Sequence, residues 1–447
     1  MNDSSKDVPT EPQKPPVKGS RLRGATRFGG RAAASIGDQA STAATSFATS
    51  LFVGRILGPE ILGIYAMTDV VVRLLRALSL SALLEPMSIY APRRSGDELG
   101  AYLCFLVVAE LVLLGGLTLL LALACVVWEA TGDINATALW ALVAALFYCN
   151  VILMQALIRR QFYIENQPLK ALIQSIGNLA LVILGFAGFW YFGGANLVSI
   201  YIMLSVAGAV VCTVQAFRLF HRFRRPTGGQ RRAFIRETWV YARWNVVSNA
   251  IAQISISGVI LLAGVMLPIE AAGYLKVNET LIAPFLQIVV GLNLLMLPMV
   301  SKRIDKMTPA HRRRDLARFT IATLVVAVPY SAIMVFFGDW MVRAGFGADL
   351  MPAASLLLIY ASIPIFDALN NPPTIFLSAE GRSDLKLIPN CIRAVLTLAA
   401  GIPLIWGFGV VGAAWARALS AFAGTAASWA CIFWLWRRQA AQRVAAD

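Results

Sequence analysis

The sequence has few of the residues that build catalytic or metal centres. Its 447 residues include two histidines, His221 and His311, which lie in separate basic segments without companion ligands. A GxxxxGK[ST] phosphate-binding loop is absent, and the six cysteines show no metal-ligand spacing. The predicted external turns are too short to hold an extramembrane catalytic domain. We therefore expect no enzymatic activity, no cofactor and no metal.

Charged residues are also scarce. They make up 14% of the chain against 58% hydrophobic residues, and the mean hydropathy is +0.68. Apolar runs of about 20 residues, each long enough to cross a bilayer, recur along almost the whole length. Lipid cannot satisfy backbone polar groups, so these runs must be helical. The sequence thus predicts an all-α integral membrane protein and excludes a water-soluble fold.

We predict about twelve transmembrane helices, with bounds uncertain by a few residues. They lie at 32–54, 61–90, 99–127, 137–158, 169–192, 197–219, 238–266, 270–299, 317–338, 350–379, 386–406 and 410–436.

The formal net charge of +15 could suggest a nucleic-acid partner, but the positions of the lysines and arginines fit the positive-inside rule of membrane topology instead. With the N-terminus inside, lysine and arginine gather on the cytoplasmic side, above all at 1–31, 218–236 and 302–318. The external turns then hold only Arg55 and Arg343. We expect a multi-pass protein with both termini in the cytoplasm.

A weak internal repeat divides the chain into two halves. In the first pair of predicted helices of each half, the matching residues are Leu57, Glu60, Gly63 and Asp69 with Leu267, Glu270, Gly273 and Glu279. Six helices per half give both halves the same orientation, so we expect two pseudo-symmetric six-helix lobes around a central cavity. The predicted divisions are a basic tail 1–31, an N-lobe 32–220, a cytoplasmic linker 221–236, a C-lobe 237–436 and a tail 437–447.

Several cations fall inside predicted spans, where each costs roughly 2.5–3.5 kcal/mol near the bilayer centre. Arg73 and Arg76 share a helix face with Asp69. A structural pair of Asp69 with Arg73 would still leave Arg76 in excess, which favours binding of an anion.

The other intramembrane cations leave alternatives open. Lys276 pairs locally with Glu279 or faces the cavity, and Arg243 either binds substrate or reaches the interface. Arg393 and Arg417 are expected to be structural. The predicted substrate-binding residues are Arg73, Arg76, Arg243 and Lys276.

Polar residues recur along one face of the first and seventh predicted helices. Such stripes either line a wet cavity or form interhelical hydrogen bonds, and their equivalent positions favour the cavity. The predicted lining residues are Asp38, Thr42, Thr45, Asn245 and Asn249. Intramembrane carboxylates can couple transport to H⁺ or Na⁺. Among the six in predicted spans, including Glu85 and Glu110, the sequence does not choose; the candidates put forward are Asp69, Glu279 and Asp367.

The segment GRILGPEILGIYA, residues 54–66, resembles a signature of Wzx-type polysaccharide exporters. ALIRRQF at 156–162 and GFGVVGAA at 407–414 are similar to further stretches of that family. The resemblance implies the multidrug/oligosaccharidyl-lipid/polysaccharide exporter fold in the bacterial inner membrane. It also implies flipping of an undecaprenyl-diphosphate-linked oligosaccharide to the outer leaflet by alternating access, for exopolysaccharide, O-antigen (lipopolysaccharide) or capsule synthesis.

We expect the lipid-linked oligosaccharide and membrane lipids as partners, together with a polysaccharide polymerase and a chain-length regulator. One alternative is a cation-coupled multidrug antiporter of the same fold, whose cavity would be rich in carboxylates and aromatic rings. Another is a non-transporting membrane component of polysaccharide assembly. The glycan, the coupling ion and the oligomeric state are not determined by the sequence.

Overall fold

The computed structural model describes residues 18–129, 136–219, 223–301, 303–304 and 307–444, and no strand occurs among them. The helices of the first half are α1 (Lys18–Ser79), η1 (Leu80–Leu84), α2 (Glu85–Tyr90), η2 (Ala91–Arg93), α3 (Gly96–Glu110), η3 (Leu111–Gly115), α4 (Gly116–Glu129), α5 (Ala136–Ile164), α6 (Pro168–Phe192) and α7 (Leu197–Leu219). Those of the second half are α8 (Gly228–Met266), α9 (Glu270–Ser301), α10 (Pro309–Gly345), η6 (Ala348–Leu356), α11 (Leu357–Tyr360), α12 (Ser362–Ala379), η7 (Ser383–Lys386), α13 (Leu387–Ala399) and α14 (Gly401–Val444). The predicted all-helical fold is confirmed.

Within the described ranges, eight helices are long and apolar enough to cross a membrane, or nine when the bent pair 348–360 and 362–379 forms one span. The remaining predicted spans correspond to α13 and to the two parts of α1, which bends at Gly58. Gly58 has φ 82°, a conformation open to glycine and strained for other residues, and Pro59 follows it. A second bend, at Gly409 with φ 57°, divides α14. The helices thus follow the predicted order of about twelve spans.

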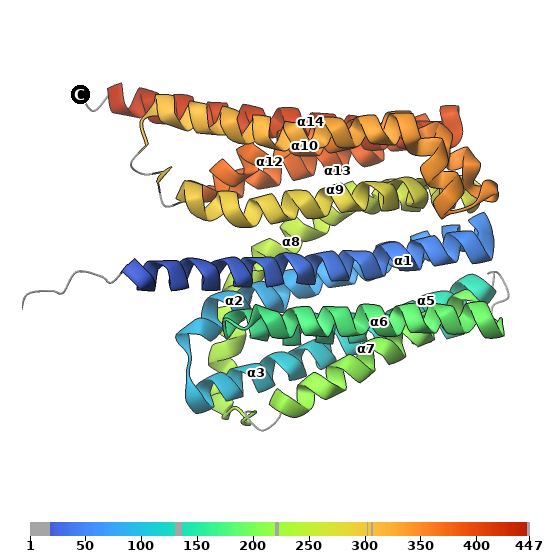
Figure 1. Ribbon diagram of the computed structural model, residues 1–447, viewed down its shortest axis with the longest axis horizontal. Helices are drawn as coiled ribbons and strands as arrows, with labels where there is room; N and C mark the ends of the chain where they lie inside the picture. The colour runs from blue at the N-terminus through green and yellow to red at the C-terminus, as the bar shows by residue number, and fades with distance from the viewer. Residues whose placement is uncertain (1–17, 130–135, 220–222, 302, 305–306, 445–447) are drawn as a thin grey trace, which may run out of the picture.

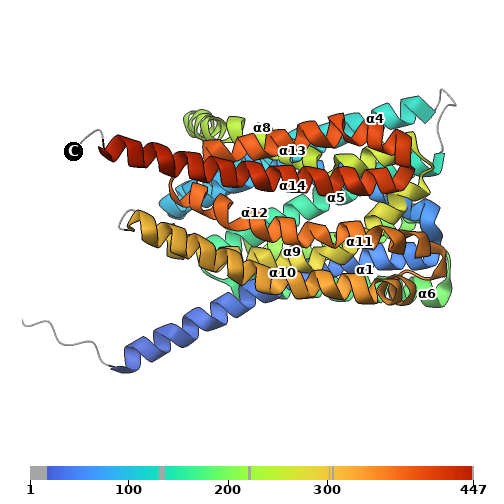
Figure 2. The ribbon, with the colours of Figure 1, turned by 90° about the horizontal axis from the view of Figure 1, so that it is seen from above.

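The helices form two lobes (Figure 1). Helices α1 to α7 make the N-lobe and α9 to α14 the C-lobe, while α8 crosses from one lobe to the other. The start of α1 and the end of α14 lie at the same end of the molecule, which we call the terminal end. In Figure 2 the first turns of α1 project away from the other helices.

Helix α8 begins well before 238, where the seventh span was predicted to start. Its first turn carries a capping box, in which the Thr227 hydroxyl accepts from the Gln230 backbone N–H and the Gln230 side chain accepts from the Thr227 backbone N–H. Phe234 is buried against Tyr102 and Phe105 of α3. Residues that were predicted as part of the linker are therefore helical from Gly228 onward. The prediction missed this turn because its basic residues lower the mean hydropathy around Phe234.

The lobes meet closely at the end opposite the terminal end. A Cβ on Gly63 would lie 2.1 Å from the carbonyl oxygen of Ile269, and one on Gly273 would lie 2.6 Å from that of Pro59. Real Cβ atoms do not approach backbone that closely, so only glycine fits at either position. These glycines are equivalent in the sequence repeat, and the fold packs α1 and α9 together there.

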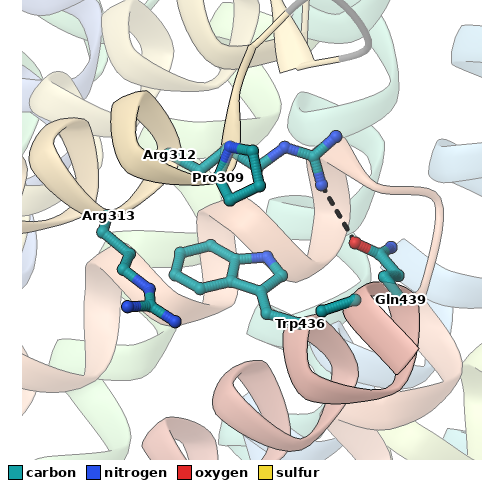
Figure 3. Close-up of a pocket in the computed structure, with 6 residues that line it drawn as sticks. Pro309, Arg312, Arg313, Trp436 and Gln439 are labelled. Carbon is teal, nitrogen blue, oxygen red and sulfur yellow. Dashed lines mark hydrogen bonds between the residues drawn. The ribbon is translucent and has the colours of Figure 1, made fainter. Parts of the chain in front are cut away.

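The C-lobe is tied together separately at the terminal end. Glu380 accepts hydrogen bonds from Arg312 of α10 and from Trp436 and Gln439 of α14, at 3.1, 2.7 and 2.6 Å. Beside this network lies a cavity of about 190 Å³, where Arg312 and Arg313 flank Trp436 (Figure 3). These contacts join the ends of two helices that are distant in sequence.

Candidate anion-binding pocket

A cavity of about 390 Å³ lies within the N-lobe, bordered by α1, α5 and α8. Four arginines line it, Arg73 and Arg76 from α1 and Arg159 and Arg160 from α5, and no aspartate or glutamate is among its described lining residues. Its other lining residues are Gln39, Ala77, Leu80, Leu84, Leu153, Ala156, Tyr163 and Gln253. Hereafter it is called the arginine pocket, and its charge and polar groups suit an anion.

A smaller recess of about 40 Å³ shares Arg76 and Arg159 with the arginine pocket. Hydroxyls and side-chain amides dominate its walls. The polar residues lining it are Thr42, Thr45, Ser46, Gln155, Gln174, Ser175 and Asn178. This polar recess extends the arginine pocket with groups that can both donate and accept hydrogen bonds.

Arg73 belongs to a network of four charges that joins the lobes. Its guanidinium lies 3.2 Å from Asp69 on the same helix and 3.0 Å from Glu279 on α9. Lys276 of α9 reaches back to Asp69 at 2.5 Å. Each lobe supplies one cation and one carboxylate, so the network is neutral as a whole. Of the sequence alternatives, the Asp69–Arg73 pair forms, while the structure pairs Lys276 with Asp69 across the lobes.

Arg76 is the cation that this network leaves over. It lines both the arginine pocket and the polar recess, and it makes no ion pair or hydrogen bond with a described residue. An intramembrane guanidinium without an ion pair is costly unless it faces a cavity or a partner. Arg76 faces both cavities, so its charge is available there.

Arg159 is held in place by the first helix. It donates to the Thr42 hydroxyl at 2.6 Å and lies 3.8 Å from the Asp38 carboxylate. Asp38 is fully buried and also accepts from Tyr163 at 2.6 Å and from Ser175. Asp38 thus lies behind the pocket wall and orients Arg159, while Thr42 and Thr45 line the polar recess itself.

The remaining predicted site residues lie outside these cavities. Asn245 and Asn249 of α8 donate to Glu85 at 3.2 Å and to Ser81 at 2.5 Å, so this stripe forms interhelical hydrogen bonds. Arg243 is exposed and does not line the arginine pocket.

The C-lobe candidate for ion coupling is also an ion-paired carboxylate. Asp367 lies 3.6 Å from the buried Arg393, and Arg417 acts electrostatically on the same arginine. The ion pair with Asp367 is consistent with the structural role that was expected for Arg393, whereas the role of Arg417 stays a prediction.

Sequence reasoning missed Arg159 and Arg160 as pocket residues because the fourth span was predicted to end at 158. Helix α5 instead continues to Ile164. Helical spacing is the signal that could have found them. Leu153, Ala156, Arg160 and Tyr163 recur every three or four residues on one face of α5, and Arg159 lies next to Arg160.

An apolar groove of about 850 Å³ adjoins the arginine pocket, with Gln39 in the lining of both. It lies between α1, α6 and α9. Its lining residues are Ile36, Gln39, Ala40, Ala43, Ala44, Phe47, Ala48, Leu179, Ile183, Ala283, Pro284, Gln287, Ile288, Gly291 and Leu292. We refer to it as the apolar groove.

This fold is similar to that of solved membrane transporters. An inward-facing multidrug resistance MATE family transporter of the MOP superfamily matches with a TM-score of 0.75 and 13% identity, covering 91% of this chain and 96% of that one. The lipid II flippase MurJ in an inward closed conformation matches with a TM-score of 0.72 and 14% identity, covering 89% and 86%.

A third similar structure is a MOP superfamily transporter from Pyrococcus furiosus, described as having a binding pocket of reversed polarity. It matches with a TM-score of 0.64 and 12% identity, covering 92% of this chain and 97% of that one. No family profile and no curated protein matches the sequence. These likenesses define the class: a two-lobe, all-helical fold shared with MATE transporters and MurJ.

Proposed function

We propose that the chain flips a lipid carrying a diphosphate-linked oligosaccharide between the leaflets of the bacterial inner membrane. The observation that carries this proposal is the arginine pocket, with four arginines and no carboxylate among its described lining residues, beside an apolar groove that shares Gln39 with it. One cavity suits an anionic headgroup and the other an isoprenoid or acyl chain. A molecule with both parts is a lipid-linked phosphate.

The diphosphate binds to Arg76, Arg159 and Arg160 in this proposal. Guanidinium groups present forked donors that match phosphate oxygens, and such contacts strengthen in a site of low dielectric. Arg73 lines the same pocket, but Asp69 and Glu279 hold its charge. Sugar hydroxyls would occupy the polar recess, where hydroxyl and amide groups exchange hydrogen bonds with them.

Movement follows from the contacts between the lobes. The glycine contact and the four-charge network join α1 to α9, whereas the arginine pocket includes Arg160 and Tyr163, near the terminal end of α5. In this proposal both termini lie in the cytoplasm, so the terminal end faces the cytoplasm. The lobes are then closed on the outer side, and the pocket faces the inner side. Export then requires the network to separate while the lobes rock to open the opposite side.

Multidrug export is the second candidate, favoured by the likeness to MATE transporters. A cavity for cationic drugs would need exposed carboxylates. Asp38 is fully buried behind the pocket wall, and Asp69 and Glu279 are paired with cations. An arginine-lined pocket repels organic cations, which places this function second. A non-transporting role in polysaccharide assembly is distinguished by whether lipid moves at all.

Reconstitution in vesicles tests the proposal. A labelled undecaprenyl-diphosphate sugar placed in one leaflet should become accessible to an impermeant enzyme on the far side, and Arg76→Gln should slow this strongly. Fluorescent cationic drugs supplied to the same vesicles should not move. Transport of the drug with no movement of the lipid would overturn the proposal in favour of the second candidate.

A further inference from the structure

One buried carboxyl group has no part in the pocket or the four-charge network. Glu110, the last residue of α3, is 2% exposed. Both of its carboxyl oxygens lie 3.0 Å from the hydroxyl of Ser79, which is 1% exposed. Glu110 makes no ion pair with any cation of the described chain. A serine hydroxyl is therefore its polar partner.

The other candidate carboxylates have different surroundings. Asp69 and Glu279 are bound by Arg73 and Lys276, and Asp367 lies beside Arg393. Each of these carboxylates thus has a cationic partner within ion-pair distance. Glu110 lacks that support.

A charged carboxylate in the membrane interior is costly when a single neutral hydrogen bond offsets its desolvation. A protonated carboxyl avoids this cost, and its O–H can donate to the Ser79 oxygen. The contact between Glu110 and Ser79 is thus satisfied best when Glu110 carries a proton.

Ser79, the partner of Glu110, lies on the same helix as two arginines of the pocket. Arg76 lies one turn before Ser79 on α1, and the buried thiol of Cys149 on α5 is within electrostatic range of both Arg76 and Glu110.

Helix α8 also packs on α3, at Tyr102. The charged groups there, Arg94 and Glu237, pair with each other at 2.5 Å. Arg76 is the pocket cation that lies closest to Ser79 along α1.

Backbone irregularities mark both partners. A π-helical turn, Leu80–Leu84, begins directly after Ser79, and another, Leu111–Gly115, begins directly after Glu110. Such turns contain an extra residue within an α-helix and occur frequently at functional sites. Loss or shift of either turn would rotate one partner relative to the other.

We propose that Glu110 is a proton-exchange site within the N-lobe, and that its protonation sets the charge beside Arg76 in the arginine pocket. When Glu110 is protonated and neutral, the positive charge of Arg76 attracts a bound anion fully. When Glu110 is ionised, its negative charge offsets part of that attraction and weakens binding of the anion. The link to anion binding rests on the proposed function, whereas proton exchange at Glu110 does not.

Infrared difference spectroscopy of the purified protein tests the exchange. The C=O stretching band of a protonated, buried carboxyl should be present at neutral pH, disappear at alkaline pH and be absent from Glu110→Gln. Asp69→Asn, which alters an ion-paired carboxylate, should retain the band. Spectra that coincide for the wild type and Glu110→Gln, or a band that persists at every pH, would overturn the proposal.

Sulfate binding tests the link, because sulfate keeps its charge across the neutral range. Its affinity should weaken several-fold from mildly acidic to alkaline pH in the wild type and stay constant in Glu110→Gln. If Glu110 titrates while sulfate affinity is independent of pH, the link to the pocket is overturned. If sulfate does not compete with a lipid diphosphate, the proposed function fails while the proton site stands.

Discussion

Arg73 of the N-lobe and Glu279 of the C-lobe form an ion pair at 3.0 Å, next to the pair between Lys276 and Asp69. Asp69 and Glu279 occupy equivalent positions of the sequence repeat, so related carboxylates from the two halves meet at one interface. Arg73 contacts both of them. The network thus fastens the lobes where the glycines also pack.

Removing one charge of this network should destabilise the protein more than removing a matched pair. Glu279→Gln leaves Arg73 with one carboxylate and should cost about 3 kcal/mol of stability. The double variant Arg73→Gln with Glu279→Gln should recover part of that loss. Thermal unfolding in nanodiscs measures both. Additive losses in the double variant would show that the two residues do not interact.

Single substitutions in the arginine pocket should weaken binding of a lipid diphosphate. Loss of one charged donor costs about 1.5–3 kcal/mol, so Arg76→Gln and Arg159→Gln should each reduce affinity at least about tenfold. Arg343→Gln, at an exposed site on α10, is the control and should leave affinity unchanged. Equal affinities across all three variants would show that Arg76 and Arg159 do not bind the lipid diphosphate.

Gly63→Ala and Gly273→Ala should open the contact between the lobes. Their Cβ atoms would collide with backbone carbonyls, which cannot move aside as a flexible side chain can. Gly291→Ala, on the same helix as Gly273, adds a Cβ with nothing within 4 Å and serves as the control. Cysteines introduced near Gly63 should react faster with impermeant reagents in the first two variants. Unchanged reactivity would contradict a closed contact there.

Filling the apolar groove should separate lipid binding from anion binding. Ala44→Trp would occupy space between α1 and α9 and should reduce flipping of a lipid-linked sugar several-fold, while sulfate affinity stays as in the wild type. Val325→Trp on the exposed face of α10 is the matched control. Flipping at the wild-type rate by Ala44→Trp would show that the chain does not enter this groove.

Much of the fold could be predicted because a bilayer admits few solutions. Long apolar runs must be helices, and their order and number follow from hydropathy. The start of α8 shows where this argument fails, because basic residues surround Phe234 and its burial depends on α3, far away in sequence. A hydropathy average over a window of residues does not detect a single apolar side chain on one face of an otherwise charged helical turn.

The candidate site was partly predictable for the same reason. Arg76 stands out because its charge has no partner nearby in sequence, and the structure adds none among the described residues. The partner of Lys276 could not be predicted. Asp69 lies on the other lobe, and only the packing of the two lobes decides whether Lys276 pairs with Asp69 or with Glu279. Glu110 was named among six carboxylates, and only its packing against Ser79 separates it from the others.

Helix α8 connects the two lobes as one continuous helix. It runs unbroken from Gly228 to Met266, anchored near its start by Phe234 in the N-lobe and joined further along to α13, where the Thr397 hydroxyl donates to the Ser255 carbonyl at 3.2 Å. Because one continuous helix contacts both lobes, we expect a tilt of one lobe to shift the other. Lengthening or bending α8 would therefore change how the lobes sit relative to each other, and it would also shift Gln253, the residue that α8 contributes to the described pocket lining.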